Sequence, residues 1–131
     1  MWTCPRCERA FGANRAHVCT PGMPVAFWLE QLPDAQRGAA EAVLAVASKR
    51  RGVVVEAVSV GVLIKRERTL VELRPKTKWL QLSFITKDAI ESPRISRRIP
   101  LATGTAYFVR LRDAADVDRE VRGWLVRSLS R

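Results

Sequence analysis

Several features that would point to common protein classes are missing from this chain of 131 residues. No apolar run approaches the about 18 consecutive residues of a membrane-spanning helix, so we expect no membrane partner. The first 20 residues contain three Cys, one His and four charges in place of an apolar segment, so no secretory signal is predicted. No internal repeat, low-complexity segment or glycine-rich phosphate loop is visible.

Residue types that carry catalysis are also scarce. The single His and all three Cys lie within the first 19 residues, where a metal site would use them. Glu72-Leu73-Arg74 resembles half of a nuclease carboxylate motif, but no Asp lies between Asp34 and Glu72 to complete it. A strand Glu more simply pairs with a basic neighbour across a sheet. We therefore expect a binding protein and not an enzyme.

What the chain does contain suits one globular domain, with or without a small appendage. Hydrophobic residues make up 47% and charged residues 27%, so a core can form without disulfides. Basic residues number 23 against 13 acids, which gives a net charge of +10. Eighteen of the basic residues are Arg, a bias typical of GC-rich bacterial genomes.

The cysteines and the histidine form one metal-ligand pattern, Cys-x2-Cys-x9-His-x-Cys. Structural zinc sites take four N or S ligands in a tetrahedron, so this pattern predicts a closed structural zinc site. Trp2 and Phe11 are expected to shield it. Only nine residues separate the ligand pairs, too few for the recognition helix of DNA-reading fingers. Reduced thiolates favour a cytoplasmic location. The predicted ligands are Cys4, Cys7, His17 and Cys19.

The remaining pattern predicts a zinc finger over 1–20 and an α+β domain over 24–131. Prolines and apolar spacing predict helices over 25–31 and 34–50, the latter with Ala35 in its buried stripe. A last helix is predicted from Asp113 as N-cap to the terminus. Strands are predicted over 53–58, 60–65, 69–74, 78–85 and 105–111. We expect 86–104 to be irregular, with a further strand over 97–101 left open.

Alternation along the strands predicts which face of the sheet is buried. Apolar residues at 71 and 73, at 80, 82 and 84, and at 107, 109 and 111 alternate mostly with polar ones. Such alternation is typical of an antiparallel sheet that is half solvated. The apolar stripes of the two long helices would cover the buried face. The fold class is therefore α+β: a mostly antiparallel sheet of about five strands with helices on one face.

The opening Trp2-Thr-Cys-Pro-Arg-Cys7, with Phe11, Asn14, His17 and Cys19 after it, resembles small bacterial proteins that carry the "domain of unknown function 5655". The runs 70–75, 80–84, 92–95 and 107–111 and the closing amphipathic helix are similar to that domain's pattern. Glu8 departs from it, because the family often has Gly there. The resemblance implies a bacterial α+β domain with a zinc-binding N-terminus, and it carries over no activity.

Positive charge is concentrated between positions 65 and 98, a stretch that contains ten basic residues and four acidic ones. Basic side chains near aromatics suit a phosphate backbone and stacked bases, so we hypothesise non-specific nucleic-acid binding. A solvated Arg-rich surface or an acidic protein partner would give the same clustering, and a protein-interaction adaptor or a small-ligand carrier stays open. DNA and RNA are not distinguished, and no oligomeric state is predicted. The candidate residues are Lys65, Arg66, Arg68, Arg74, Lys76 and Lys78, with Arg6, Arg9 and Arg15 of the finger.

Overall fold

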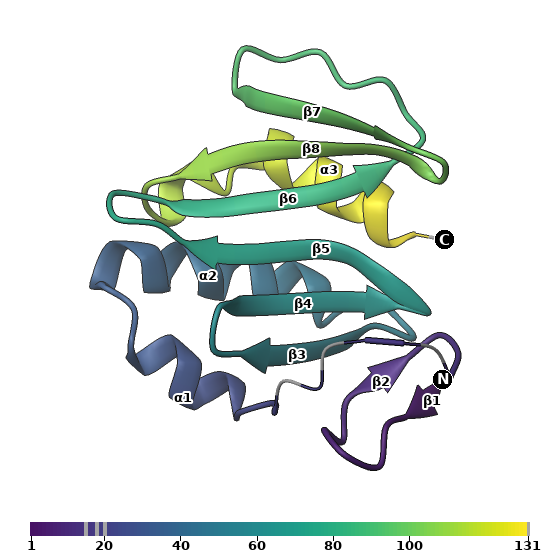
Figure 1. The fold of residues 1–131 in the computed structure, drawn as a ribbon. Coiled ribbons are helices and arrows are strands. Elements are labelled where there is room, and N and C mark those ends of the chain that lie inside the picture. The colour runs from purple at the N-terminus through teal and green to yellow at the C-terminus, as the bar shows by residue number, and fades with distance from the viewer. Residues whose placement is uncertain (15, 18, 20, 131) are drawn as a thin grey trace.

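The computed structural model describes residues 1–14, 16, 17, 19 and 21–130. It confirms the α+β class: a six-stranded antiparallel sheet carries helices on one face, and a two-stranded sheet forms at the N-terminus (Figure 1). In Figure 1, α2 and α3 lie behind the large sheet, and the face toward the viewer carries no helix of the described chain. No helix in this part of the chain is long and apolar enough to cross a membrane.

The large sheet has the strand order β3-β4-β5-β6-β8-β7, and every neighbouring pair is antiparallel. The first four strands follow one another through short turns, whereas β8 inserts between β6 and β7. The strands are β3 (Val54–Val58), β4 (Gly61–Arg66), β5 (Arg68–Pro75), β6 (Leu80–Thr86), β7 (Ile95–Leu101) and β8 (Gly104–Leu111).

The expected alternation defines the buried face of this sheet. Leu82 and Phe84 of β6 and Val109 of β8 are fully or almost fully buried, as are the apolar residues predicted on β5. Phe84 stacks between two rings, with centroids 5.5 Å from Tyr107 and 5.5 Å from Trp124. The core therefore lies between the sheet and its helices, and none of the described finger residues belongs to it.

The sixth strand corrects the expectation for 86–104. Pro93, Pro100 and Gly104 suggested an irregular segment, yet β7 pairs with β8 over most of that segment's second half. Pro100 is tolerated because β7 is an edge strand, where a missing N–H breaks no ladder bond on the outer side. The further strand left open by the sequence is therefore present and begins two residues earlier.

Three α-helices occur close to their predicted positions, as α1 (Val25–Glu30), α2 (Asp34–Ala47) and α3 (Arg119–Leu129). Ala35 is exposed, and Gln36 takes its expected place in the buried stripe of α2. Asp113 caps only a 3₁₀ turn, η1 (Ala114–Asp116). The N-cap of α3 is Asp118, whose side chain accepts from the Val121 amide at 3.1 Å. That cap corrects the predicted helix start by five residues.

Candidate metal centre and open sheet face

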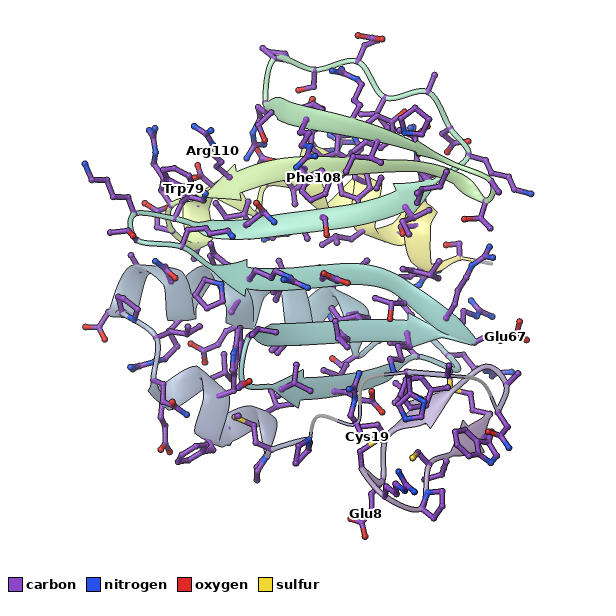
Figure 2. All side chains as sticks on the ribbon, in the orientation of Figure 1. Glu8, Cys19, Glu67, Trp79, Phe108 and Arg110 are labelled. Atoms are coloured by element: carbon purple, nitrogen blue, oxygen red, sulfur yellow. The ribbon has the colours of Figure 1, made fainter. Side chains whose placement is uncertain are left out.

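The finger begins as a tight hairpin that aims two thiols at one point. Its strands are β1 (Trp2–Thr3) and β2 (Ala10–Phe11), which pair antiparallel. The Glu8 amide donates to the Cys4 carbonyl at 2.8 Å, and the Cys4 amide donates to the Arg9 carbonyl at 2.9 Å. Glu8 itself has φ 59°, a left-handed conformation that favours Gly. The turn forms in spite of the side chain, which Figure 2 shows at the outer tip of the finger.

The four predicted ligands lie together, with their ligand atoms within 4.8 Å of one another. Tetrahedral zinc with Zn–S of about 2.3 Å and Zn–N of about 2.0 Å requires about 3.8 Å between two sulfurs and about 3.5 Å between sulfur and nitrogen. The observed Cys4 Sγ–Cys19 Sγ distance is 3.8 Å. Nε2 of His17 lies 3.5 Å from Cys7 Sγ and 3.4 Å from Cys19 Sγ. These three distances match edges of a zinc tetrahedron, so this cluster could hold a metal ion.

The pKa values of two of the thiols, those of Cys4 and Cys19, are shifted in opposite directions. Hydrogen bonding from the Cys7 backbone amide lowers the pKa of Cys4 to about 6, against the effect of burial. Desolvation, with the adjacent Cys4 sulfur, raises the pKa of Cys19. Thiolates are the form that binds metal, and clustered thiolates repel one another until a cation neutralises them. A bound cation could therefore stabilise the thiolate forms of this cluster.

Aromatic rings cover the histidine side of the centre, as the sequence suggested. Phe11 stacks on His17 with ring centroids 4.0 Å apart. Trp2 meets the same imidazole edge-on at 5.9 Å. Such packing limits the orientations of the imidazole and therefore positions Nε2 toward the sulfurs.

A buried ion pair connects the finger to the large sheet. Nζ of Lys65 lies 2.7 Å from Oε1 of Glu56, and the two side chains are 2% and 11% exposed. Lys65 also donates to the Ala10 carbonyl at 2.7 Å, while Oε2 of Glu56 accepts from the Ala10 amide at 2.7 Å. The backbone carbonyl and the backbone amide of Ala10, a finger residue, are therefore both hydrogen-bonded to this ion pair. Burial raises the pKa of Glu56, but Lys65 and the Ala10 amide outweigh that effect and hold the pKa below its ordinary value.

The same network changes the role of two predicted nucleic-acid contacts. Lys65 is buried beneath the finger, with Nζ 4.2 Å from the Phe11 ring centroid. Nε of Arg9 forms an ion pair with Glu56 at 3.3 Å, and its guanidinium lies 5.3 Å from the same ring. Both cations therefore bind the finger to the domain in place of contributing to an exposed basic surface.

The other predicted contacts do not form one patch. Arg68 begins β5, whereas Arg74 is its last residue but one, so six steps of about 3.3 Å place the two residues roughly 20 Å apart along the strand. Arg66 donates to the Leu129 carbonyl at 2.8 Å, at the C-terminal end of α3. Arg6 is exposed on the finger, and Arg15 lies outside the described residues. Only Arg74 and the exposed Lys76 and Lys78 remain near one another, in and just after the last residues of β5.

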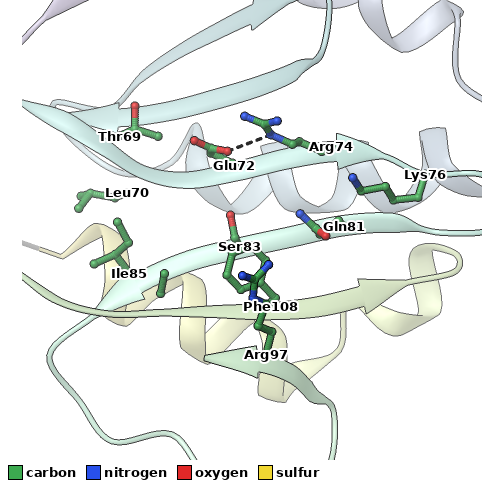
Figure 3. Close-up of a pocket in the computed structure, with 11 residues that line it drawn as sticks. Thr69, Leu70, Glu72, Arg74, Lys76, Gln81, Ser83, Ile85, Arg97 and Phe108 are labelled. Carbon is green, nitrogen blue, oxygen red and sulfur yellow. Dashed lines mark hydrogen bonds and ion pairs between the residues drawn. The ribbon is translucent and has the colours of Figure 1, made fainter. Parts of the chain in front are cut away.

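The helix-free face of the sheet presents a different set of side chains. The register aligns Glu72, Ser83, Phe108 and Arg97 in one row across β5, β6, β8 and β7. A second row, from the same register, contains Arg74, Gln81 and Arg110. Most of these residues line a groove of about 410 Å³ (Figure 3).

Two guanidinium groups on this face lie against aromatic rings. Arg110 Cζ is 4.4 Å from the Trp79 ring centroid, and the two side chains lie together at one end of β6 and β8 (Figure 2). Arg97 Cζ is 5.7 Å from the Phe108 centroid. Alternation assigned Phe108 and Arg110 to the polar face. The partnership with Arg97 depends on the β8–β7 pairing, which no local pattern indicates.

The charge on this face is only partly neutralised. Arg74 bonds to Glu72 at 3.2 Å. Within the described chain, none of the ion pairs involves Lys76, Arg97 or Arg110. The face thus combines three unpaired cations with two partly exposed rings.

No family model, curated protein or solved structure matches this chain. The chemistry of its own residues therefore carries the functional interpretation.

Proposed function

We propose that this protein is a zinc-stabilised binding module that binds nucleic acid through the helix-free face of its large sheet. The observation that carries the proposal is the set of unpaired cations beside Trp79 and Phe108 on that face. Phosphates are attracted by such cations without sequence preference, because arginines and lysines that contact only the backbone carry no base information.

Zinc is the metal that this ligand set favours. Three thiolates and one imidazole at tetrahedral spacing match closed structural zinc sites, whereas calcium and magnesium prefer oxygen ligands. In this role the metal holds the finger and contributes no catalytic step. The pattern of reduced thiols fits a cytoplasmic protein, and the resemblance to the "domain of unknown function 5655" is compatible with such a module.

Position on a rigid scaffold supports the binding role. The Lys76 amide donates to the Trp79 carbonyl at 2.8 Å and closes the turn between β5 and β6. From behind the sheet, Nε2 of Gln36 donates to the Lys76 carbonyl at 2.8 Å. The turn that carries Lys76, Lys78 and Trp79 is therefore held in place before any ligand arrives, which reduces the entropy lost on binding.

A salt-dependent titration tests the proposal. Fluorescence anisotropy of labelled single-stranded and double-stranded oligonucleotides is measured at several salt concentrations from about 50 mM upward. Five cations lie on and beside the face: Arg74, Lys76, Lys78, Arg97 and Arg110. If all five contact phosphates, they predict a log–log slope of roughly −3.5 for single strands and −4.5 for duplexes. The slope should not depend on base sequence.

Charge reversal locates the surface. Arg97→Glu with Arg110→Glu should abolish most binding, because both cations belong to the proposed face. The matched control is Arg119→Glu with Arg122→Glu, which makes the same charge change at two exposed positions of α3, behind the sheet. Equal losses in the two double variants would mean that net charge alone drives binding. No binding by the zinc-loaded protein at about 50 mM salt would refute the proposal.

A protein-interaction adaptor is the second candidate, and a different surface favours it. Val25, Leu29, Leu44 and Val55 line a largely apolar groove of about 380 Å³ between α1, α2 and β3. The Phe27 side chain, on α1, is 54% exposed. If nucleic acid fails to bind, Leu29→Asp should disrupt the partner complex and leave the metal content unchanged.

A further inference from the structure

We infer that the helix-free face selects single-stranded over double-stranded nucleic acid, with unpaired bases stacking on the Trp79–Arg110 and Phe108–Arg97 pairs. This inference rests on the proposed function and adds the class of ligand. The two pairs are flat, partly exposed and adjacent on one surface. A base can stack on an aromatic ring or on a guanidinium plane, and both kinds of plane are present in each pair.

The spacing of the pairs argues for splayed bases. Phe108 and Arg110 are two residues apart on β8, so about 7 Å separates them along the strand. That distance is about twice the 3.4 Å rise per nucleotide of a stacked strand. Two bases bound at these positions must therefore be pulled out of continuous stacking. A single strand does this readily, whereas a duplex must first lose base pairs.

Residues beside the two aromatic pairs can contact the base edges and phosphates of a single nucleic-acid strand. Gln81 and Ser83 of β6 line the groove between β5 and β8, and the half-buried Gln81 offers hydrogen-bond donors and an acceptor to base edges. Lys76 and Arg74 lie on the far side of the groove, where they can contact phosphates. Figure 3 shows this order across the sheet, from Arg97 and Phe108 through Ser83 to Glu72. Among the described residues that line the groove, Glu72 is the only acid, and Arg74 neutralises it.

The helix-free face of the sheet is open to a single nucleic-acid strand. Sheets of single-strand-binding modules leave one face free of helices and stack two or three bases on it. Here α2 and α3 cover only the opposite face (Figure 1). Three inter-strand steps from β5 to β7 give a platform roughly 14 Å wide. That width accommodates a few nucleotides and not an extended duplex contact.

Abasic probes separate stacking from charge. Labelled oligothymidylate and oligouridylate of about 12 nucleotides are compared with an abasic strand of equal length and with a duplex. The wild-type protein should bind the base-containing strands at least about 25-fold tighter than the abasic strand, which is about 5-fold for each of the two rings. Trp79→Ala with Phe108→Ala should lose about 5- to 150-fold per ring, so that base-containing and abasic strands bind alike. The salt slope should stay unchanged, because no cation is removed.

Two further variants guard against a folding artefact. Trp79→Phe keeps a stacking ring and should retain most of the preference for bases. Phe27→Ala removes an exposed ring from α1, away from the sheet face, and should change nothing. If the wild-type protein binds abasic, base-containing and duplex probes equally, the inference is wrong and the proposed function stands. If it binds no probe, both fail.

Discussion

Replacing Lys65 with Met should destabilise the protein far more than any surface lysine change. Lys65 is 2% exposed and bonds at 2.7 Å to both Glu56 and the Ala10 carbonyl. Removal of one partner of a buried ion pair typically costs about 3–5 kcal/mol, because the other charge is left uncompensated. Glu56 would retain its bonds from the Ala10 amide and Arg9, so we expect the lower end, about 3 kcal/mol.

Urea denaturation of the zinc-loaded protein measures this loss, with Lys78→Met as the exposed control, which should change stability by about 0.5 kcal/mol or less. The double variant with Glu56→Gln should recover about 2 kcal/mol relative to the sum of the single changes. The cost of Lys65→Met should also shrink in a Cys7→Ser background, because a finger without metal no longer covers the ion pair. A loss below about 1 kcal/mol for Lys65→Met would refute the docking role.

Three other predictions follow from individual residues. Elemental analysis should find one zinc per chain in the wild-type protein and none in Cys7→Ser, which should keep the cooperative unfolding of the large domain, because no described finger residue belongs to its core. Gly12→Ala should lower the free energy of unfolding by about 1–3 kcal/mol, because the added Cβ would lie 2.3 Å from the Glu67 carbonyl oxygen. Gly123→Ala, whose added Cβ would have nothing within 4 Å, should stabilise α3. Asp118→Ala should cost about 1 kcal/mol at neutral pH, more than Asp113→Ala. The Val121 amide and Arg94 lower the pKa of Asp118 below its ordinary 3.8, so this cost should persist above that pH and vanish as the pH falls below it, in urea titrations at each pH.

Local sequence patterns predicted much of this fold because their physical causes are local. Side chains alternate across a strand, so the apolar residues of β6 and β8 indicated the buried face without any knowledge of the partners. The ligand pattern indicated a metal site because three thiols and one imidazole within 16 positions are typical ligands of a structural zinc site. The prediction of the N-cap of α3 was wrong for the opposite reason. Asp113, Asp116 and Asp118 all suit a helix start, and tertiary contacts decide among them. Arg94, which bonds to both carboxylate oxygens of Asp118 at 2.9 Å, comes from a distant loop.

Non-local pairing explains what the sequence could not predict. Lys65 lies in a charged run and resembles a surface residue, but a register shift between Ile64 and Lys65 and the docked finger place it in a buried pair. The insertion of β8 between β6 and β7 brings Arg97 to Phe108, and this strand order leaves no trace in periodicity. Charge clustering therefore grouped Lys65 with exposed basic residues, although Lys65 is buried in an ion pair with Glu56.

Chemical-shift mapping by NMR tests the central claim most directly. Isotope-labelled, zinc-loaded protein is titrated with oligothymidylate, and backbone amide shifts are followed residue by residue. The largest shifts should fall on the backbone amides of Gln81, Ser83, Phe108 and Arg110 and of Arg97 in β7, and the Trp79 indole N–H should shift with them. The amides of α2 and α3 should remain nearly unchanged. Shifts confined to the finger or to the groove between α1 and α2, with the sheet face silent, would contradict it.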